Sequence, residues 1–421
     1  MSWGADDLVR RLAPSEERFV GSGLFGWWTM VVAGELAPAV LSAAFTTLQR
    51  VYPVLTCRIV EDARGRGLLV KRAAGPRVGA WVRTGDVDTV ADPAGPTDPA
   101  AQLAYLDVVL AEGRSRVTLF VHHAVADARH LMELYGRLWD FYTDPAAAAK
   151  TGDGRDYPQS LEWHVATHGI ERGPISGLAA VLRPFDATPE IPSGPPLGGV
   201  LVRPARLRLD DDLTASISAL SRRYGLTINS VVTAVLMRAW AVRTPEFAGG
   251  PVPVGALYAV DLRDRLDPPV PVAAGTTMAT TACFAAEIDG RTDVLELAHR
   301  ISGRFRDELA AGIIHQSVLH FPDVYGAERE HGLAGHLSLT NLGVINTPAA
   351  LDVLDFETGF QLAHPRLSAA DSPAALLMFY TFGGRITIGH LGGGADENPL
   401  LASVRREIAA LAPAGRAELV R

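Results

Sequence analysis

A stretch rich in proline and glycine lies near the middle of the chain and separates two parts of similar length. Residues 183–204 combine repeated prolines with glycines, which interrupt regular secondary structure. The chain has 421 residues, which is more than one ordinary hydrophobic core supports. We therefore predict an N-terminal half over residues 1–185, a linker over 186–204 and a C-terminal half over 205–421.

Both halves alternate strand-like and helix-like segments. Residues 26–32 are rich in aromatic and β-branched side chains, as strands are, and Pro38 begins a segment with apolar residues at helical spacing. In the C-terminal half we expect strands at 254–262, 281–288, 336–341 and 375–390, and helices at 228–240, 292–312 and 397–412. Strands mixed with long helices indicate an α/β fold.

Charge and composition argue against several classes of protein. The net charge of −8 repels nucleic acid, so we expect no nucleic-acid partner. Cys57 and Cys283 have apolar neighbours and no CxxC spacing. His164 and His168 have the i, i+4 spacing of a metal pair but lack an adjacent glutamate and a clear third ligand, so we expect no metal. The sequence has no apolar run of membrane-spanning length and no signal-peptide pattern at its start, so we expect a cytoplasmic protein without a membrane span.

The segment from His122 to Asp127 is the most specific signal for chemistry. Residues 116–121 read as a half-buried strand, and a helical pattern resumes after Asp127, so the histidine pair lies in a short loop between rigid elements. A histidine can take a proton from a hydroxyl while that oxygen attacks an activated carbonyl. On these residues alone, a structural histidine that is merely hydrogen-bonded is an equally good interpretation.

The run His122-His123-Ala124-Val125-Ala126-Asp127 resembles the HHxxxDG motif of the chloramphenicol acetyltransferase-like superfamily. This group includes the condensation domains of nonribosomal peptide synthetases and the polyketide-associated (Pap) acyltransferases. The chain looks most similar to the Pap subgroup, and in particular to the phthiocerol/phthiodiolone dimycocerosyl transferases. That similarity runs nearly end to end and includes residues 12–17, 52–55, 258–263 and 312–321.

The resemblance implies a fold and a set of site residues. The fold would be two acetyltransferase-like half-domains, each a mixed sheet with flanking helices, with an active-site tunnel at their interface. His123 would be the general base and His122 a supporting residue of the motif. Asp127 would orient the motif loop through an ion pair with an arginine of the second half, for which we predict Arg263, with Arg265 as the nearest competitor.

Two further positions follow from the same resemblance. Asn341 lies in a segment similar to the S/T-N-x-G pattern of condensation-type members, so it would position substrate, although a turn-forming asparagine is an equal alternative. Ala128 replaces the glycine of the motif. Alanine would be strained there at positive φ but suits a helix, and the helical pattern after Asp127 favours the helix.

The implied activity is O-acylation. The acyl group would pass from a coenzyme A or acyl carrier protein thioester to a hydroxyl of a polyketide or lipid-like acceptor, in secondary metabolism or in making cell-envelope lipid. The thioester is a co-substrate and no cofactor is expected, because a thioester is already activated. We expect a monomer, since both halves lie in one chain. Two alternatives remain open at this point, a condensation-type enzyme with an amine acceptor and a noncatalytic scaffold of the same fold.

Overall fold

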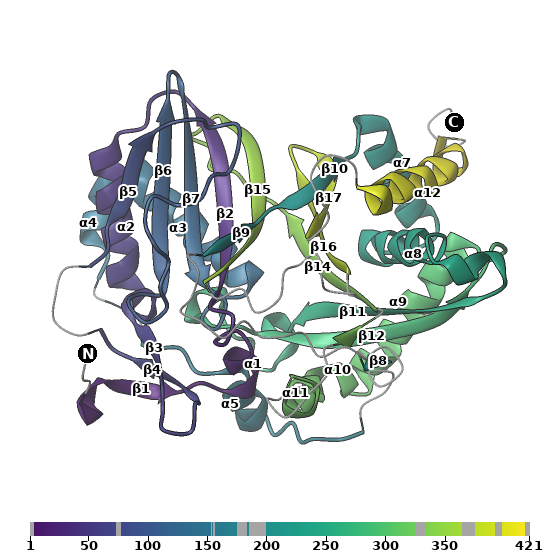
Figure 1. Cartoon of the computed structure of the whole chain (residues 1–421), viewed down its shortest axis with the longest axis horizontal. Helices are drawn as coiled ribbons and strands as arrows, with labels where there is room; N and C mark the ends of the chain where they lie inside the picture. Colours follow the sequence, from purple (N-terminus) through teal and green to yellow (C-terminus); the bar gives the residue numbers. More distant parts are fainter. Residues whose placement is uncertain are drawn as a thin grey trace.

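Two six-stranded sheets stand side by side in the computed structural model (Figure 1). The strand orders are β5-β6-β7-β2-β15-β9 and β10-β17-β16-β14-β11-β12, and each sheet contains both parallel and antiparallel pairs. The predicted α/β class with two mixed sheets is therefore confirmed. The structure describes residues 4–72, 77–152, 154, 156–174, 183–184, 199–325, 333–334, 336–363, 375–391 and 398–416.

The first sheet carries its helices on one face. Its strands are β2 (Leu24–Ala33), β5 (Ala80–Thr84), β6 (Ala104–Ala111), β7 (Arg114–His122), β9 (Val200–Val202) and β15 (Val353–Leu362), and its main helices are α2 (Pro38–Val51) and α3 (Ala128–Thr143).

The second sheet also packs against helices. Its strands are β10 (Pro204–Arg208), β11 (Val252–Asp261), β12 (Ala279–Ile288), β14 (His336–Val344), β16 (Ala375–Phe382) and β17 (Arg385–Leu391), and its helices are α7 (Asp211–Arg223), α8 (Ile228–Ala241), α9 (Val294–Ala310) and α12 (Pro399–Arg416).

Shorter elements complete the fold. They are α1 (Pro14–Glu17), α4 (Pro145–Lys150), α5 (Leu161–Thr167), α10 (Ile313–Gln316), α11 (Phe321–Tyr325), the small sheet of β1 (Leu8–Arg11), β3 (Arg58–Glu61) and β4 (Gly67–Val70), and the pair β8 (Arg183–Pro184) and β13 (Leu333–Ala334).

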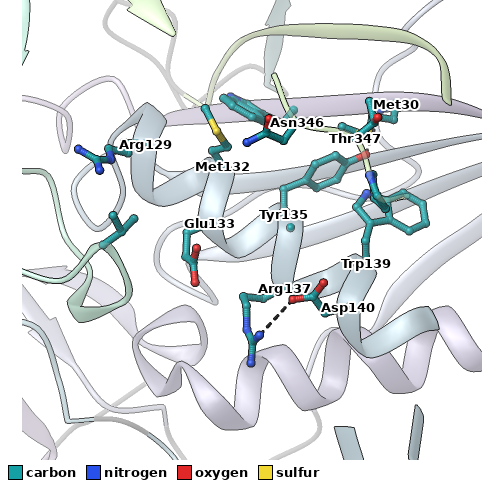
Figure 2. Close-up of a pocket in the computed structure, with 14 residues that line it drawn as sticks. Met30, Arg129, Met132, Glu133, Tyr135, Arg137, Trp139, Asp140, Asn346 and Thr347 are labelled. Carbon is teal, nitrogen blue, oxygen red and sulfur yellow. Dashed lines mark hydrogen bonds and ion pairs between the residues drawn. The ribbon is translucent and has the colours of Figure 1, made fainter. Parts of the chain in front are cut away.

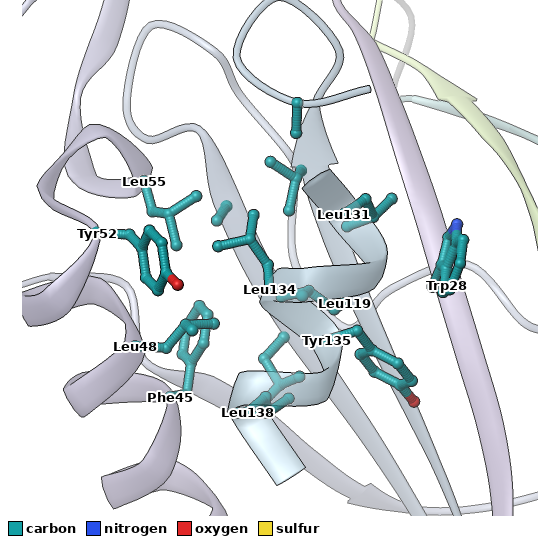
Figure 3. Close-up of a cluster of buried hydrophobic side chains, with 14 of the residues drawn as sticks. Trp28, Phe45, Leu48, Tyr52, Leu55, Leu119, Leu131, Leu134, Tyr135 and Leu138 are labelled. Carbon is teal, nitrogen blue, oxygen red and sulfur yellow. The ribbon is translucent and has the colours of Figure 1, made fainter. Parts of the chain in front are cut away.

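Strand β2 is buried along its whole central part because both of its faces are covered. Successive side chains of a strand point to opposite faces. Trp28 and Met30 join the apolar cluster under α2 and α3, which Figure 3 shows around Leu131, while Trp27 packs in a second cluster on the other face. This explains why residues 26–32 read as a continuous apolar run and not as an alternating one.

Strand β15 joins the two halves of the chain. It belongs to the C-terminal half in sequence, yet it pairs antiparallel with β2 from Val353↔Val32 to Leu362↔Leu24 (Figure 1). Strand β9 then pairs with β15 at the edge of this sheet. Residues 186–198 of the predicted linker lie outside the described residues, and its last residues form β9 and begin β10.

The strand predicted at 375–390 is wrong in one respect, because it is a hairpin of two strands. The turn between β16 and β17 contains Gly383 and Gly384 with φ of 55° and 75°. Glycine adopts such positive φ without a steric penalty. Among the described residues, no helix combines the length and the apolar character that crossing a membrane requires.

We predict that Gly359→Ala on β15 destabilises the fold by about 1–3 kcal/mol, as overpacking of a core typically does. A Cβ atom there would lie 2.5 Å from Trp27 Cζ2 and 2.5 Å from the Val202 carbonyl oxygen, so the strands would have to separate. Urea unfolding measures the loss. Gly290→Ala is the control, because a Cβ at Gly290 meets no atom within 4 Å. Equal midpoints for both variants would contradict the close approach of β15.

Candidate functional site

The first histidine of the motif is a core residue. His122 ends β7 and is completely buried. Its ring lies edge-on to Phe25 with centroids 5.0 Å apart, and its Nδ1 accepts a hydrogen bond of 3.3 Å from the Ala124 N–H. Burial lowers the pKa of His122 to about 3, with a smaller contribution from His123. His122 is therefore neutral at physiological pH, and its buried ring is hydrogen-bonded to the backbone of the motif loop at Ala124.

The second histidine is half-buried and held through its backbone. The His123 N–H donates to the Leu24 carbonyl at 2.8 Å, and the His123 carbonyl accepts from Thr277 Oγ1 at 2.6 Å. The imidazole stacks on the Phe19 ring with centroids 4.2 Å apart and an angle of 21° between the planes. Phe360 of β15 lies on another side, at 5.8 Å. Segments from both halves thus fix the position and the plane of this ring.

The surroundings of His123 favour its neutral form. Burial lowers its pKa to about 4, and the nearby positive charge of Arg18 acts in the same direction. The backbone of His123 itself and the Asp127 carboxylate oppose this shift but do not cancel it. At pH 7 the imidazole is therefore unprotonated, which is the state that a general base needs.

Asp127 lies at the point where the motif loop meets α3 and the second half. One carboxylate oxygen accepts from the His130 N–H at 2.9 Å and so caps α3. The other lies 2.8 Å from Arg263 Nη1 and also accepts from the Met278 N–H at 2.8 Å. Burial alone would raise the pKa of Asp127, but the Arg263 charge and these hydrogen bonds lower it overall. Asp127 is therefore ionised, and both of its carboxylate oxygens are used by hydrogen bonds within the protein.

Arg263 is the arginine that the structure places against Asp127. It is fully buried and also donates to Asp261 Oδ1 at 3.0 Å and to the Thr276 carbonyl at 2.8 Å. Arg265, the competing residue, donates instead to the Asp261 carbonyl. The ion pair joins the motif of the first half to the loop that links β11 and β12 in the second.

The loop from β11 to β12 is itself in an unusual conformation. Thr276 has φ of +90°, the only positive φ of a non-glycine residue in the described part of the chain. Such a conformation costs free energy that the surroundings must supply. Thr276 Oγ1 donates to the buried carboxylate of Glu16 at 2.7 Å, and Thr276 forms an isolated parallel bridge with Ala126. These contacts place Thr277 against the His123 carbonyl.

A small cavity lies beside His123, between the two sheets. Its volume is about 50 Å³. The wall comes from β2, the motif loop, α3, β14, β15, β16 and β17, and consists of Gly26, Trp28, His123, Ala126, Asp127, Ala128, Leu131, Thr340, Leu342, Thr358, Gly359, Phe360, Leu376, Leu377, Met378 and Leu391. Most of these side chains are apolar, so the imidazole faces a space with few competing polar groups.

A larger pocket of about 340 Å³ opens further along α3. Figure 2 shows Arg129, Met132 and Tyr135 of α3 on one side of it, and Asn346 and Thr347 near them. Trp28 of β2 lines both spaces.

Asn341 is not brought to this cavity. It is exposed on β14, where its Nδ2 donates to Asn229 Oδ1 at 3.4 Å and its Oδ1 accepts from the Gly343 N–H at 2.9 Å. Its neighbours Thr340 and Leu342 line the cavity instead, since side chains alternate along a strand.

Ala128 behaves as the helical pattern predicts. It is the first residue of α3 and is not at positive φ, so the alanine in place of the motif glycine is unstrained. The described residues contain no group of three metal-ligating side chains close enough to hold an ion. Residue 331, a further histidine of the sequence, lies outside the described residues.

Three residues at the site were missed by sequence reasoning. His123 contacts Phe19, Thr277 and Phe360. Each of these residues lies more than a hundred positions from His123 along the chain. Their residue types are common in cores and turns, so no local pattern marks them.

We predict that Asp127→Asn lowers the free energy of unfolding by about 3 kcal/mol, because Arg263 would lose part of the charge that compensates its burial. Guanidinium chloride unfolding measures this. Asp264→Asn is the matched control, since Asp264 pairs with Arg129 at the surface, where ion pairs contribute about 0–1 kcal/mol. If the two variants lost equal stability, the ion pair would not be the structural tie between the halves.

Comparisons with known proteins agree with this geometry. A family model described as the phthiocerol/phthiodiolone dimycocerosyl transferase C-terminus matches residues 198–391. The phthiocerol/phthiodiolone dimycocerosyl transferase of Mycobacterium tuberculosis is 30% identical over 418 residues, which cover 94% of this chain and 95% of that protein.

Solved structures show the same fold. Polyketide synthase associated protein 5 from Mycobacterium tuberculosis superposes with a TM-score of 0.78 at 27% identity, covering 97% of this chain and 99% of that one. The first condensation domain of the calcium-dependent antibiotic synthetase gives 0.64 at 15% identity, with 96% of each chain covered, and shows the fold alone. The chain therefore belongs to the phthiocerol/phthiodiolone dimycocerosyl transferase family, and it is an acyltransferase with the condensation-domain fold.

Proposed function

We propose that this acyltransferase moves an acyl group from a thioester of coenzyme A or an acyl carrier protein to a hydroxyl of a polyketide or lipid-like acceptor, with His123 as the general base. The observation that carries the proposal is a neutral imidazole on the wall of an apolar cavity between the two sheets. The acceptor class is taken from the relatives, one named for phthiocerol and phthiodiolone and one for a polyketide synthase.

The reaction begins with the hydroxyl of the acceptor. Nδ1 of His123 is buried, so Nε2 is the nitrogen available to the substrate. Nε2 accepts the hydroxyl proton while the oxygen attacks the thioester carbonyl carbon. The imidazolium that forms lies near the Asp127 carboxylate, whose negative charge favours it.

The carbonyl oxygen becomes an oxyanion when the new carbon–oxygen bond forms. Helix α3 starts at Ala128 on the cavity wall, and a helix N-terminus favours negative charge. The carbon–sulfur bond then breaks, and the imidazolium gives its proton to the departing thiolate. The ester and the free thiol leave, and His123 is neutral again without a metal or a redox cofactor.

An amine acceptor, as in peptide condensation, is the competing proposal. An amine can attack without a base, so the presence of a positioned imidazole at His123 favours a hydroxyl, whose proton must be removed. Direct competition between an alcohol and an amine of equal chain length distinguishes them. If the amide forms faster than the ester, the acceptor is an amine and the proposed hydroxyl acceptor is wrong.

We predict that His123→Ala lowers alcohol-dependent thiol release by about 10²–10⁴-fold, the usual contribution of a general base. Thiol release from acyl thioesters with an alcohol present measures this. His299→Ala is the control, because His299 is an exposed residue of α9 far from the motif in sequence. Both variants should keep the wild-type melting temperature within a few degrees. Normal turnover by His123→Ala would refute the assignment of the base.

We predict that kcat/KM is flat down to about pH 5 and falls tenfold per pH unit below about pH 4, because the neutral form of His123 is lost only there. Arg18→Gln should move this midpoint upward, since the Arg18 charge lowers the pKa of His123. A midpoint near pH 6.5 in the wild type would contradict the proposed environment of the base.

The stability of the fold must be followed in the same experiment. His122 and His123 have lowered pKa values when folded, so the unfolded chain binds more protons between about pH 6.5 and pH 3. Stability therefore decreases as the pH falls through this window. Short pH jumps, with circular dichroism as the control for folding, separate loss of the base from loss of the fold.

A further inference from the structure

One buried carboxylate near the start of the chain is connected to two groups that contact His123. We propose that this residue, Glu16, is a positioning residue for His123. It holds the Phe19 ring against the imidazole by one route and the Thr277 hydroxyl against the His123 carbonyl by another. Glu16 is not among the described residues that line the cavity, so it acts through these two contacts. The inference rests on the proposed function, because it takes His123 as the base.

Glu16 is fixed in its orientation by four donors. Its side chain is completely buried. Arg10 donates to both carboxylate oxygens, at 2.6 and 2.7 Å, and the Ala13 N–H donates to one of them at 3.0 Å. Thr276 Oγ1 donates to the other at 2.7 Å, from the second half of the chain. A buried carboxylate is costly unless it is paired, and bidentate pairing with an arginine fixes its geometry. Glu16 therefore ties the N-terminal segment to the loop between β11 and β12.

The first route follows the chain from Glu16 to Phe19. The Phe19 N–H donates to the Glu16 carbonyl at 3.2 Å, and the Phe19 ring stacks on the imidazole of His123. The Arg18 guanidinium lies over the Phe19 ring at 4.5 Å and over the Phe321 ring of α11 at 4.8 Å. Helix α1, which contains Glu16, lies beside α11 (Figure 1). The turn after Glu16 thus places on the base an aromatic ring that is also supported from the second half.

The second route crosses from Glu16 to the loop between β11 and β12. Thr276 has φ of +90°, which a β-branched residue adopts only when its surroundings compensate the strain. The hydrogen bond to Glu16 fixes its side chain, and a bond from Arg263 to its carbonyl at 2.8 Å fixes its backbone. The next residue, Thr277, is completely buried and donates to the His123 carbonyl at 2.6 Å. Without the Glu16 carboxylate, Thr276 would lose one of these two restraints, and Thr277 would be less firmly placed.

A loosened His123 should lose rate before the enzyme loses affinity for its substrate. Proton transfer needs the imidazole within hydrogen-bond distance of the hydroxyl, and a misplacement of about 1 Å can cost about 10²-fold in rate. Burial is the main cause that lowers the pKa of His123 to about 4, so a less closely packed ring should titrate nearer to its ordinary pKa of about 6.5. A residue that only stabilises the fold would change neither kcat nor this pKa in the folded protein.

The test compares Glu16→Gln with Asp107→Asn, using thiol release from the acyl-coenzyme A thioester that gives the highest wild-type rate with a fixed alcohol. Glu16→Gln should lower kcat by about 10-fold to 10²-fold, leave the KM for the thioester within about threefold, and raise the midpoint of the pH profile by about one unit. Asp107 of β6 is the matched control, because it is also a buried carboxylate that accepts from an arginine, Arg83, and from a backbone N–H, that of Ala94. Asp107→Asn should keep the wild-type kcat and pH profile.

Variants of the two threonines separate the second route from a general loss of stability. Thr277→Ser keeps the hydroxyl that donates to the His123 carbonyl and should stay within about threefold of the wild-type kcat, whereas Thr277→Val should lower kcat as Glu16→Gln does. Thr276→Val removes the donor to Glu16 and keeps the shape of the side chain. It replaces Glu16→Gln if that variant does not fold, as judged by circular dichroism.

Nuclear magnetic resonance of labelled histidine gives a measurement that does not depend on turnover. The ring current of Phe19 shifts the signal of the stacked His123 ring, and His123→Ala identifies that signal by its loss. Glu16→Gln should move the signal toward the position of an unstacked histidine, and Asp107→Asn should not. A Glu16→Gln variant with wild-type kcat, pH midpoint and His123 signal overturns the inference and leaves the proposed function intact. Normal thiol release by His123→Ala refutes the proposed function, whereas the His123 signal still decides whether Glu16 positions the ring.

Discussion

The buried ion pair between Asp127 and Arg263 is the constraint on which the rest of the site depends. Two charges withdrawn from water are costly unless almost every donor and acceptor is used. Here the carboxylate accepts from Arg263, from the first turn of α3 and from the Met278 N–H, while the guanidinium also reaches Asp261 and the Thr276 carbonyl. One interaction therefore fixes the start of α3, the motif loop and the β11–β12 loop together. The position of His123, between these elements, follows from it.

The lowered pKa of His123 has one advantage and one disadvantage for a general base. A histidine with the ordinary pKa of about 6.5 is already about three quarters neutral at pH 7. Lowering the pKa to about 4 adds little neutral form and makes the imidazole a weaker base. In the proposed reaction the catalytic gain comes from position, because the ring is stacked on Phe19 and the His123 backbone is hydrogen-bonded to Leu24 and Thr277. A base held at hydrogen-bonding distance in an apolar space compensates for low basicity.

The sequence predicted those parts of the site that depend on neighbours along the chain. The strand before His122 and the helix after Asp127 follow from local periodicity, and that periodicity also placed Ala128 correctly in the helix. Arg263 came from resemblance, and the ion pair is present. Asn341 illustrates the limit of such reasoning. Adjacent strand residues face opposite sides, and no local pattern tells which side of β14 faces the cavity, so the neighbours of Asn341 line it instead.

Strand β15 explains why the remaining parts were not predicted. Its partner β2 lies more than three hundred residues earlier, and nothing within residues 353–362 identifies that pairing. The pairing of β15 with β2 also affects the cavity beside His123. Without β15, strand β2 would be an unpaired edge with exposed N–H and C=O groups, and the cavity would lose Thr358, Gly359 and Phe360. The surroundings of the proposed general base and the cavity beside it therefore form only when chain from both sides of the proline- and glycine-rich stretch is in place, although the histidine motif is contained in the first part alone.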